Sequence, residues 1–103
     1  MIKSKDILKN GLISLDVDAY QAFVGRRRIN LTSTEFNLLA AFLKNRGETV
    51  SREDLLRSVW GVSYRGTSRT VDTHIQRLRS KLGKVGRLIR TVRTVGYRLE
   101  RVP

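Results

Sequence analysis

The sequence predicts a small α+β domain in which an antiparallel sheet precedes three helices and a terminal hairpin. Two observations carry this prediction. Short, β-prone apolar stretches occupy the beginning and the end of the chain, and apolar residues at helical spacing occupy the middle. The length of 103 residues suits one core. We therefore expect a single domain over residues 1–103, with the sheet over about 6–31, the helices over about 33–82 and the hairpin over about 87–101.

The predicted sheet consists of short strands that are separated by turns. We expect strands over residues 11–16, 20–24 and 28–31, with a further edge strand over 6–9. The first two are apolar and β-prone, and the third alternates polar and apolar residues at period two. The segments Asp16–Asp18 and Gly25–Arg27 have the composition of turns.

In the middle of the chain, the sequence pattern predicts two helices, each with a capping residue. Thr32 and Glu35 form a capping box before an amphipathic stripe of Phe36, Leu39, Ala40 and Leu43. Gly47 is a plausible terminator of this helix. Ser51 caps a second, shorter helix with acidic residues in its first turn, where the helix dipole favours them. The stretch 60–67 has no apolar stripe, so we expect a loop there.

A third helix is predicted over about Ser68–Leu82, ending at Gly83. Its apolar residues are Val71, Ile75, Leu78 and Leu82, which share one face of a helix. The opposite face carries Arg69, Thr73, Gln76, Arg77 and Ser80. His74 and Arg79 flank the apolar stripe. One face can therefore pack, while the other presents guanidinium, amide and hydroxyl groups. Residues 88–101 then alternate as a hairpin, with its bend expected at Val95-Gly96.

Composition narrows the function. The formal net charge is +12, and eleven of the 21 basic residues lie within residues 65–101, which hold only two acidic residues. Such segregation indicates a polyanionic partner, most commonly nucleic acid. The chain has no cysteine and one histidine, so thiol catalysis, thiolate sites and multi-histidine metal sites are excluded. No apolar run approaches the roughly 18 residues of a membrane span. We expect Asp72 to pair with an arginine rather than to act as an acid or base.

Strands, three helices and a basic hairpin in this order are typical of a winged helix-turn-helix. A helix fits the major groove of DNA when its other face is anchored to a core. Arginine and glutamine on the exposed face can read base edges, and flanking cations and hydroxyls can bind phosphates. An arginine on the hairpin can reach an adjacent minor groove.

Four motifs occur in the order and at about the spacing of the OmpR/PhoB family of bacterial response regulators. They are Leu31–Phe36, Val59–Gly61, Arg69–Arg79 and Thr91–Leu99. The chain resembles the C-terminal effector domain of that family from about Ile7 to Arg101. The resemblance implies a four-stranded N-terminal sheet, a three-helix body with the third helix as the DNA reader, and a C-terminal wing. The phosphoacceptor domain usual in the family is absent from this chain.

The resemblance also implies roles for individual residues. The third-helix positions that contact DNA are Arg69, His74, Arg77 and Arg79, with Thr73, Gln76 and Ser80 on the groove side. Trp60, Thr91 and Tyr97 occupy phosphate-facing or supporting positions, and Arg93 matches the wing arginine of the minor groove. The loop that touches RNA polymerase in the family corresponds to Val62, Ser63, Tyr64, Arg65, Gly66 and Thr67. Thr94 stands beside the wing arginine where relatives commonly have glycine.

Several of these residues also have a purely structural interpretation. His74 is either wedged between elements or a phosphate contact, Trp60 is partly core, and Tyr97 packs within the hairpin. Arg26–Arg28 is interpreted as a solvated turn.

For the whole chain, we expect sequence-specific binding of double-stranded DNA, a homodimer on tandem sites, contact with RNA polymerase and a cytoplasmic location. No enzymatic activity, cofactor or metal is expected. Two alternatives stay open: the DNA-binding part of a membrane-tethered one-component activator, and a module that mainly docks on RNA polymerase.

Overall fold

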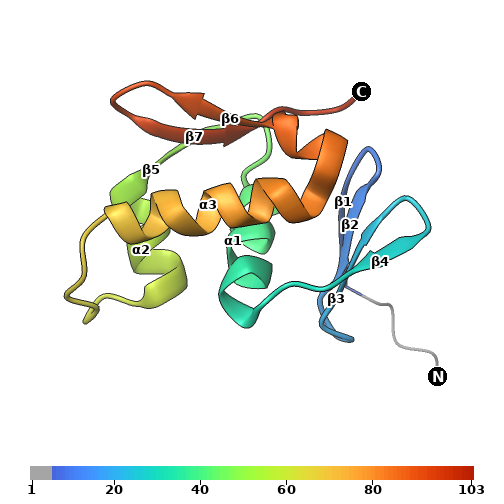
Figure 1. Ribbon diagram of the computed structural model, residues 1–103, viewed down its shortest axis with the longest axis horizontal. Coiled ribbons are helices and arrows are strands. Elements are labelled where there is room, and N and C mark those ends of the chain that lie inside the picture. The colour runs from blue at the N-terminus through green and yellow to red at the C-terminus, as the bar shows by residue number, and fades with distance from the viewer. Residues whose placement is uncertain (1–5) are drawn as a thin grey trace.

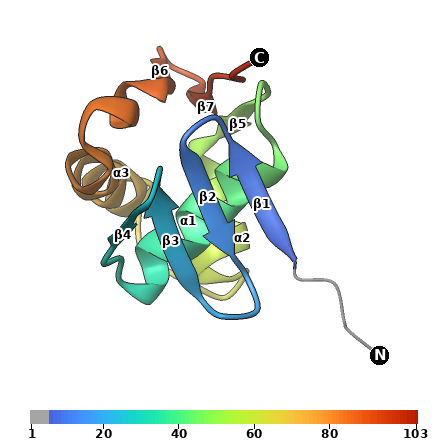
Figure 2. The same cartoon turned by 90° about the vertical axis from the view of Figure 1, so that its right-hand side faces the viewer.

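A four-stranded antiparallel sheet begins the fold in the computed structural model, which describes residues 6–103 (Figures 1 and 2). Its strands are β1 (Ile7–Asn10), β2 (Ile13–Asp16), β3 (Gln21–Val24) and β4 (Arg27–Ile29), and they pair in the order β1-β2-β3-β4. Ile13, Leu15 and Ala22 are buried because alternate residues of a strand point to the same face. The predicted sheet, including its edge strand, is confirmed.

Three helices follow: α1 (Ser33–Lys44), α2 (Arg52–Trp60) and α3 (Arg69–Leu82). The predicted capping box is confirmed, because Thr32 Oγ1 accepts from the Glu35 N–H at 3.2 Å and Glu35 Oε1 accepts from the Thr32 N–H at 2.9 Å. Ser51 caps α2 as predicted. Helix α1 ends at Lys44 with Asn45 as its C-cap, so Gly47, at φ +84°, lies two residues beyond the cap. Helix α1 packs against β1, α2 and α3, so it lies at the centre of the domain.

A second, three-stranded sheet was predicted only in part. The hairpin of β6 (Ile89–Val92) and β7 (Gly96–Leu99) is present, but β5 (Thr49–Ser51), between α1 and α2, joins it in the order β5-β7-β6. The sequence gives no signal for β5, because three residues are too few to show a period. A 3₁₀ helix, η1 (Gly83–Leu88), lies between α3 and the hairpin, in a stretch for which the sequence predicts no element. It packs against α3.

The bend of the hairpin differs from the prediction. The turn covers Arg93–Val95, with Thr94 at φ +65°, whereas Gly96 already belongs to β7. Gly96 is opposite Ser51 in the sheet, and a Cβ at this position would stand 2.0 Å from the carbonyl oxygen of Val50. Glycine is therefore required here for the close approach of β5 rather than for the turn.

The core of the described residues lies between the three helices and the inner faces of the two sheets. Helix α3 contributes Val71, Ile75, Leu78 and Leu82, all of them fully buried, which confirms the predicted apolar stripe. Within residues 6–103, no helix is both long and apolar enough to cross a bilayer.

Candidate nucleic-acid interface

The polar face of α3 is exposed as the sequence predicts. Arg69, Thr73, Gln76, Arg77 and Ser80 are all exposed, while the opposite side of the helix is buried in the core. Among residues 6–103, no side chain bonds to those of Gln76 or Arg77. The helix has 14 residues, so this face is about 21 Å long. The Thr73 hydroxyl donates to the Arg69 carbonyl at 3.3 Å, whereas the side chains of Gln76 and Arg77 are free to meet an external partner.

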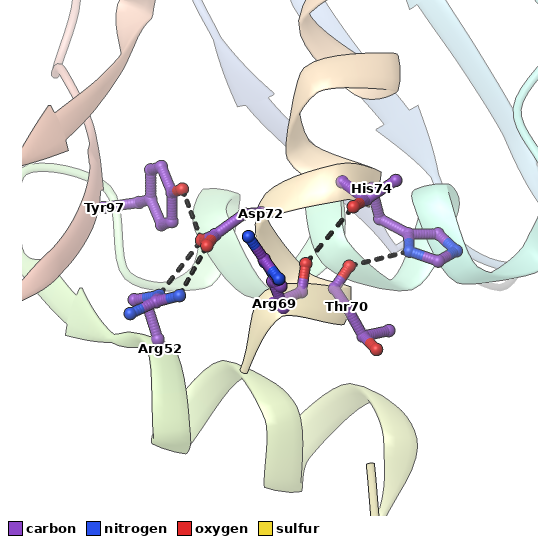
Figure 3. A network of polar contacts seen from close by, with 7 residues as sticks. Arg52, Arg69, Thr70, Asp72, His74 and Tyr97 are labelled. Atoms are coloured by element: carbon purple, nitrogen blue, oxygen red, sulfur yellow. Dashed lines mark hydrogen bonds and ion pairs between the residues drawn. The ribbon is translucent and has the colours of Figure 1, made fainter. Parts of the chain in front are cut away.

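Asp72 lies beside this face and joins α3 to two other elements (Figure 3). Its carboxylate accepts two hydrogen bonds from the Arg52 guanidinium of α2 and one of 2.6 Å from the Tyr97 hydroxyl of β7. The predicted pairing of Asp72 with an arginine is confirmed. Burial raises the pKa of Asp72, but the bonds from Tyr97 and Arg52 outweigh it, so the net pKa is lowered. Arg52 was not singled out from the sequence, because nothing in its local pattern points to Asp72.

Tyr97 and Arg79 lie inside this arrangement rather than at its surface. Tyr97 is only 7% exposed, and its hydroxyl is directed at Asp72. The Arg79 guanidinium stands over the Tyr97 ring, 5.5 Å from its centroid, and donates to the carbonyl of Ile89 and to Thr91 Oγ1 on β6. The packing interpretation of Tyr97 is therefore favoured over a direct DNA contact. Arg79 and Tyr97 together tie the hairpin to α3.

His74 and Trp60 pack together on the other side of α3. Their rings meet edge to face at 5.1 Å, and both side chains are half-buried. His74 Nδ1 lies 2.9 Å from the carbonyl oxygen of Thr70. Because a carbonyl only accepts, Nδ1 must carry a proton. Nε2 is then the ring nitrogen that is left to face a phosphate, so the structural and phosphate-binding interpretations of His74 are compatible.

The loop between α2 and α3 projects from the body (Figure 1). All six residues of the predicted polymerase-contact loop, 62–67, are exposed, and Val62 is 87% exposed. Tyr64 contacts the Trp60 ring at 6.2 Å between centroids, and its hydroxyl lies 3.3 Å from Thr70 Oγ1. The loop thus offers an apolar side chain to solvent close to the beginning of α3.

The wing places Arg93 in its exposed turn, as the resemblance implies. Val92, the last residue of β6, is half-buried, whereas Arg93 is exposed. A hollow of about 230 Å³ separates the wing from the body; its lining includes Thr91, Arg93 and Tyr97 together with Arg52 and Asp72. The wing is therefore held at its base by Arg79 and Tyr97 and is open toward its tip.

A helix with an exposed polar face, carried on a three-helix body and joined to a basic hairpin, defines a winged-helix domain. Residues 25–99 match the family described as "Transcriptional regulatory protein, C terminal". The chain belongs to this family.

The similar proteins agree with this assignment. The transcriptional regulatory protein SrrA of Staphylococcus aureus is 37% identical over 101 residues, which cover 94% of this chain and 42% of SrrA. The chain thus spans less than half the length of this relative. The RstA DNA-binding domain of Klebsiella pneumoniae, solved in complex with the RstA box, has a TM-score of 0.81 and 31% identity, covering 92% of this chain and 97% of that domain.

DrrB, a response regulator of Thermotoga maritima described as an OmpR/PhoB homologue, also has a TM-score of 0.81 and 31% identity, over 91% of this chain and 44% of DrrB. The resemblance to the OmpR/PhoB family is confirmed.

Proposed function

We propose that this chain binds double-stranded DNA with sequence specificity, as the effector domain of a bacterial transcription regulator of the response-regulator type. The observation that carries the proposal is the exposed face of α3, whose polar side chains lie opposite a fully buried apolar stripe. A helix of this kind fits the major groove of B-DNA. The complex of the similar RstA domain with its box supports the same partner for this chain.

In the proposed complex, the residues of α3 divide into two groups. Gln76 and Arg77 read base edges, since an amide pairs bidentately with adenine and a guanidinium with guanine. Phosphates are held, and the register is set, by the side chains of Arg69, Thr73, His74 and Ser80. Trp60 contributes through its indole N–H. Arg79 acts mainly by holding Thr91 and the wing in place. Arg93 enters the minor groove beside the major-groove site.

The proposal extends to protein partners and location. Two copies occupy tandem DNA sites, and the exposed loop 62–67 contacts RNA polymerase in the cytoplasm. All six residues of this loop are exposed and therefore accessible to a protein partner. The resemblance to the OmpR/PhoB family supports the tandem arrangement.

Selection of bound duplexes from a random pool tests the central claim. We expect one motif to be enriched, and Gln76→Ala and Arg77→Ala each to relax the preference at one or two base pairs, at about 1–3 kcal/mol per lost base contact. Lys9→Ala is the control, because Lys9 is exposed on the edge strand β1 and lies on a different element. If both α3 variants keep the relative affinities of the unmodified chain across a panel of mutated sites, the major-groove assignment is wrong.

A further inference from the structure

The exposed stripe of α3 stops at a glycine. Arg69, Thr73, Gln76 and Ser80 follow one another at spacings of four, three and four residues, and the next position of the stripe is Gly83. Gly83 ends the helix at φ +68°, a conformation that other residues rarely adopt. The helix itself therefore supplies no side chain at the end of its exposed face.

A guanidinium from the N-terminal sheet lies at this vacant position. Nη2 of Arg27 is 3.7 Å from the point where a Cβ of Gly83 would stand. Arg27 is the first residue of β4, which Figure 2 shows at the edge of the four-stranded sheet next to β3. In the sheet Arg27 is opposite Val24, and Ile29 is opposite Ala22. Val24, Ile29 and Ala22 all pack on the core, so Arg27 lies on the helix-facing side of β4.

Arg27 has no acidic partner that would explain its position. It is exposed, and no carboxylate among residues 6–103 forms an ion pair with it. The neighbouring Arg28 is equally exposed, but alternation places its side chain on the other face of the strand. The sequence interpretation of Arg26–Arg28 as a turn is therefore wrong for two of the three residues, because Arg27 and Arg28 belong to β4. One of them lies beside the end of α3 and the other is directed away from it.

We propose that Arg27 extends the DNA-binding face of α3 beyond the last turn of the helix and binds a backbone phosphate there. The inference rests on the proposed function, because it requires α3 to lie in the major groove. A guanidinium is suited to this contact, since its fork of N–H groups matches phosphate oxygens. The sheet then has a role in binding: it supplies the cation that the terminal glycine of α3 cannot.

The test compares Arg27→Ala with Arg28→Ala, two variants that each remove one exposed charge from the same strand, β4. Binding to the duplex enriched by the unmodified chain, and to a mixed-sequence duplex, is titrated between about 50 and 200 mM salt. Each neutralised phosphate contributes about −0.9 to the slope of log affinity against log salt. We expect Arg27→Ala to make the slope shallower by about 0.9 and Arg28→Ala to leave it unchanged. Shortening the enriched duplex on the side under the end of α3 is expected to lower the affinity of the unmodified chain to that of Arg27→Ala.

Other results distinguish a failure of the Arg27–phosphate contact from a failure of DNA binding by α3. Equal slopes for both variants overturn the inference while leaving DNA binding by α3 intact. A flat salt dependence of the unmodified chain overturns the proposed function and the inference together. If Arg27→Ala lowers the midpoint of urea unfolding but not the salt slope, Arg27 only stabilises the C-terminal carbonyls of α3. If Arg27→Ala prevents two copies of the chain from pairing on DNA but does not alter the DNA binding of a single copy, the partner of Arg27 is a second copy of the chain and not a phosphate.

Discussion

At the scale of single residues, Asp72 shows how one carboxylate joins three elements. It belongs to α3 and accepts from Arg52 of α2 and Tyr97 of β7. Burial and the bond to Asp72 raise the pKa of Tyr97 to about 12, so its hydroxyl stays protonated and donates throughout the physiological range. The orientation of the wing relative to α3 therefore depends on a bond that does not titrate near neutral pH.

Substitution of Tyr97 by phenylalanine removes the hydroxyl and keeps the aromatic ring. In Tyr97→Phe the stacking position of Arg79 is kept, and only the hydrogen bond to Asp72 is lost. We expect the free energy of unfolding to fall by about 1.5–3 kcal/mol, the usual contribution of a hydrogen bond to a charged group. Urea unfolding measures this loss. We also expect the wing to bind DNA more weakly. The affinities for duplexes with A/T flanks and with G/C flanks should then differ less than they do for the unmodified chain.

Tyr64→Phe is the matched control for this change. Its hydroxyl also has one partner, Thr70 Oγ1 at 3.3 Å, but both groups lie near the surface and neither is charged. Its effect on unfolding is expected to stay within about 0.5 kcal/mol. Equal losses of unfolding free energy in Tyr97→Phe and Tyr64→Phe would show that the hydrogen bond from Tyr97 to Asp72 contributes no more than the exposed bond of Tyr64.

At the scale of elements, the wing is stable at its base and unusual at its tip. Arg79 bonds to β6 at Ile89 and Thr91, and β7 pairs with both β5 and β6. In the turn, Thr94 adopts φ +65°, and its hydroxyl donates to the Arg93 carbonyl at 2.6 Å. This local bond partly offsets the cost of a positive φ for a β-branched residue. The turn therefore presents Arg93 from a defined conformation.

Arg93→Ala tests the placement of this turn. A projecting cation gains most in a narrow minor groove, where the potential is most negative. We therefore expect the variant to lose more affinity on duplexes with an A/T tract beside the major-groove site than on those with G/C there. Arg90→Ala serves as the control, since Arg90 is exposed on β6 away from the turn. Arg98 is unsuitable as a control because it is paired with Glu100.

The outcomes for the wing are distinct. Equal losses on both flanks for Arg93→Ala indicate an ordinary phosphate contact. No loss on either flank means that the turn at Thr94 directs the wing away from DNA.

At the scale of the whole molecule, Glu35 connects the beginning of α1 to the later turns of α3. Its carboxylate is 2% exposed and accepts from Lys81 at 2.6 Å as well as from the backbone of Thr32. Burial raises the pKa of Glu35, but the bonds from Lys81 and Thr32 outweigh it, and the net pKa is lowered. Glu35 therefore serves both as a cap and as the point where two helices are joined.

The lowered pKa values of Glu35 and Asp72 predict loss of stability in acid. A carboxylate with a lower pKa in the folded state stabilises the fold above its unfolded pKa, which is about 4, and this contribution disappears as the pH falls through the folded pKa. We expect the free energy of unfolding to decrease as the pH falls below about 4. Glu35→Gln is expected to cost about 1–2 kcal/mol at neutral pH and to flatten this decrease. Urea unfolding between pH 2 and pH 7 measures both effects.

Glu48→Gln provides the comparison, because Glu48 is exposed and no ion pair is formed by its side chain among residues 6–103. It should leave both the neutral stability and the acid dependence unchanged. An acid dependence that is as steep in Glu35→Gln as in the unmodified chain would contradict the role given to Glu35.

Local patterns along the chain were enough to predict the N-terminal sheet, the caps at Thr32 and Ser51, and both faces of α3, because each depends on residues within a few positions of one another. The exposure of the DNA-reading candidates follows from that same spacing. The sequence also predicts that Asp72 pairs with an arginine, but not which one.

Tertiary packing decided the rest. Strand β5 exists because β7 lies beside it, and Gly96 is needed for that approach rather than for the turn. Arg52, Asp72 and Tyr97 come from three elements far apart in sequence. Arg27 and Gly83 are also distant in sequence but close in the structure. The periodicity of the sequence does not predict such pairs, because their contact depends on how the sheet and the helices pack on a shared core.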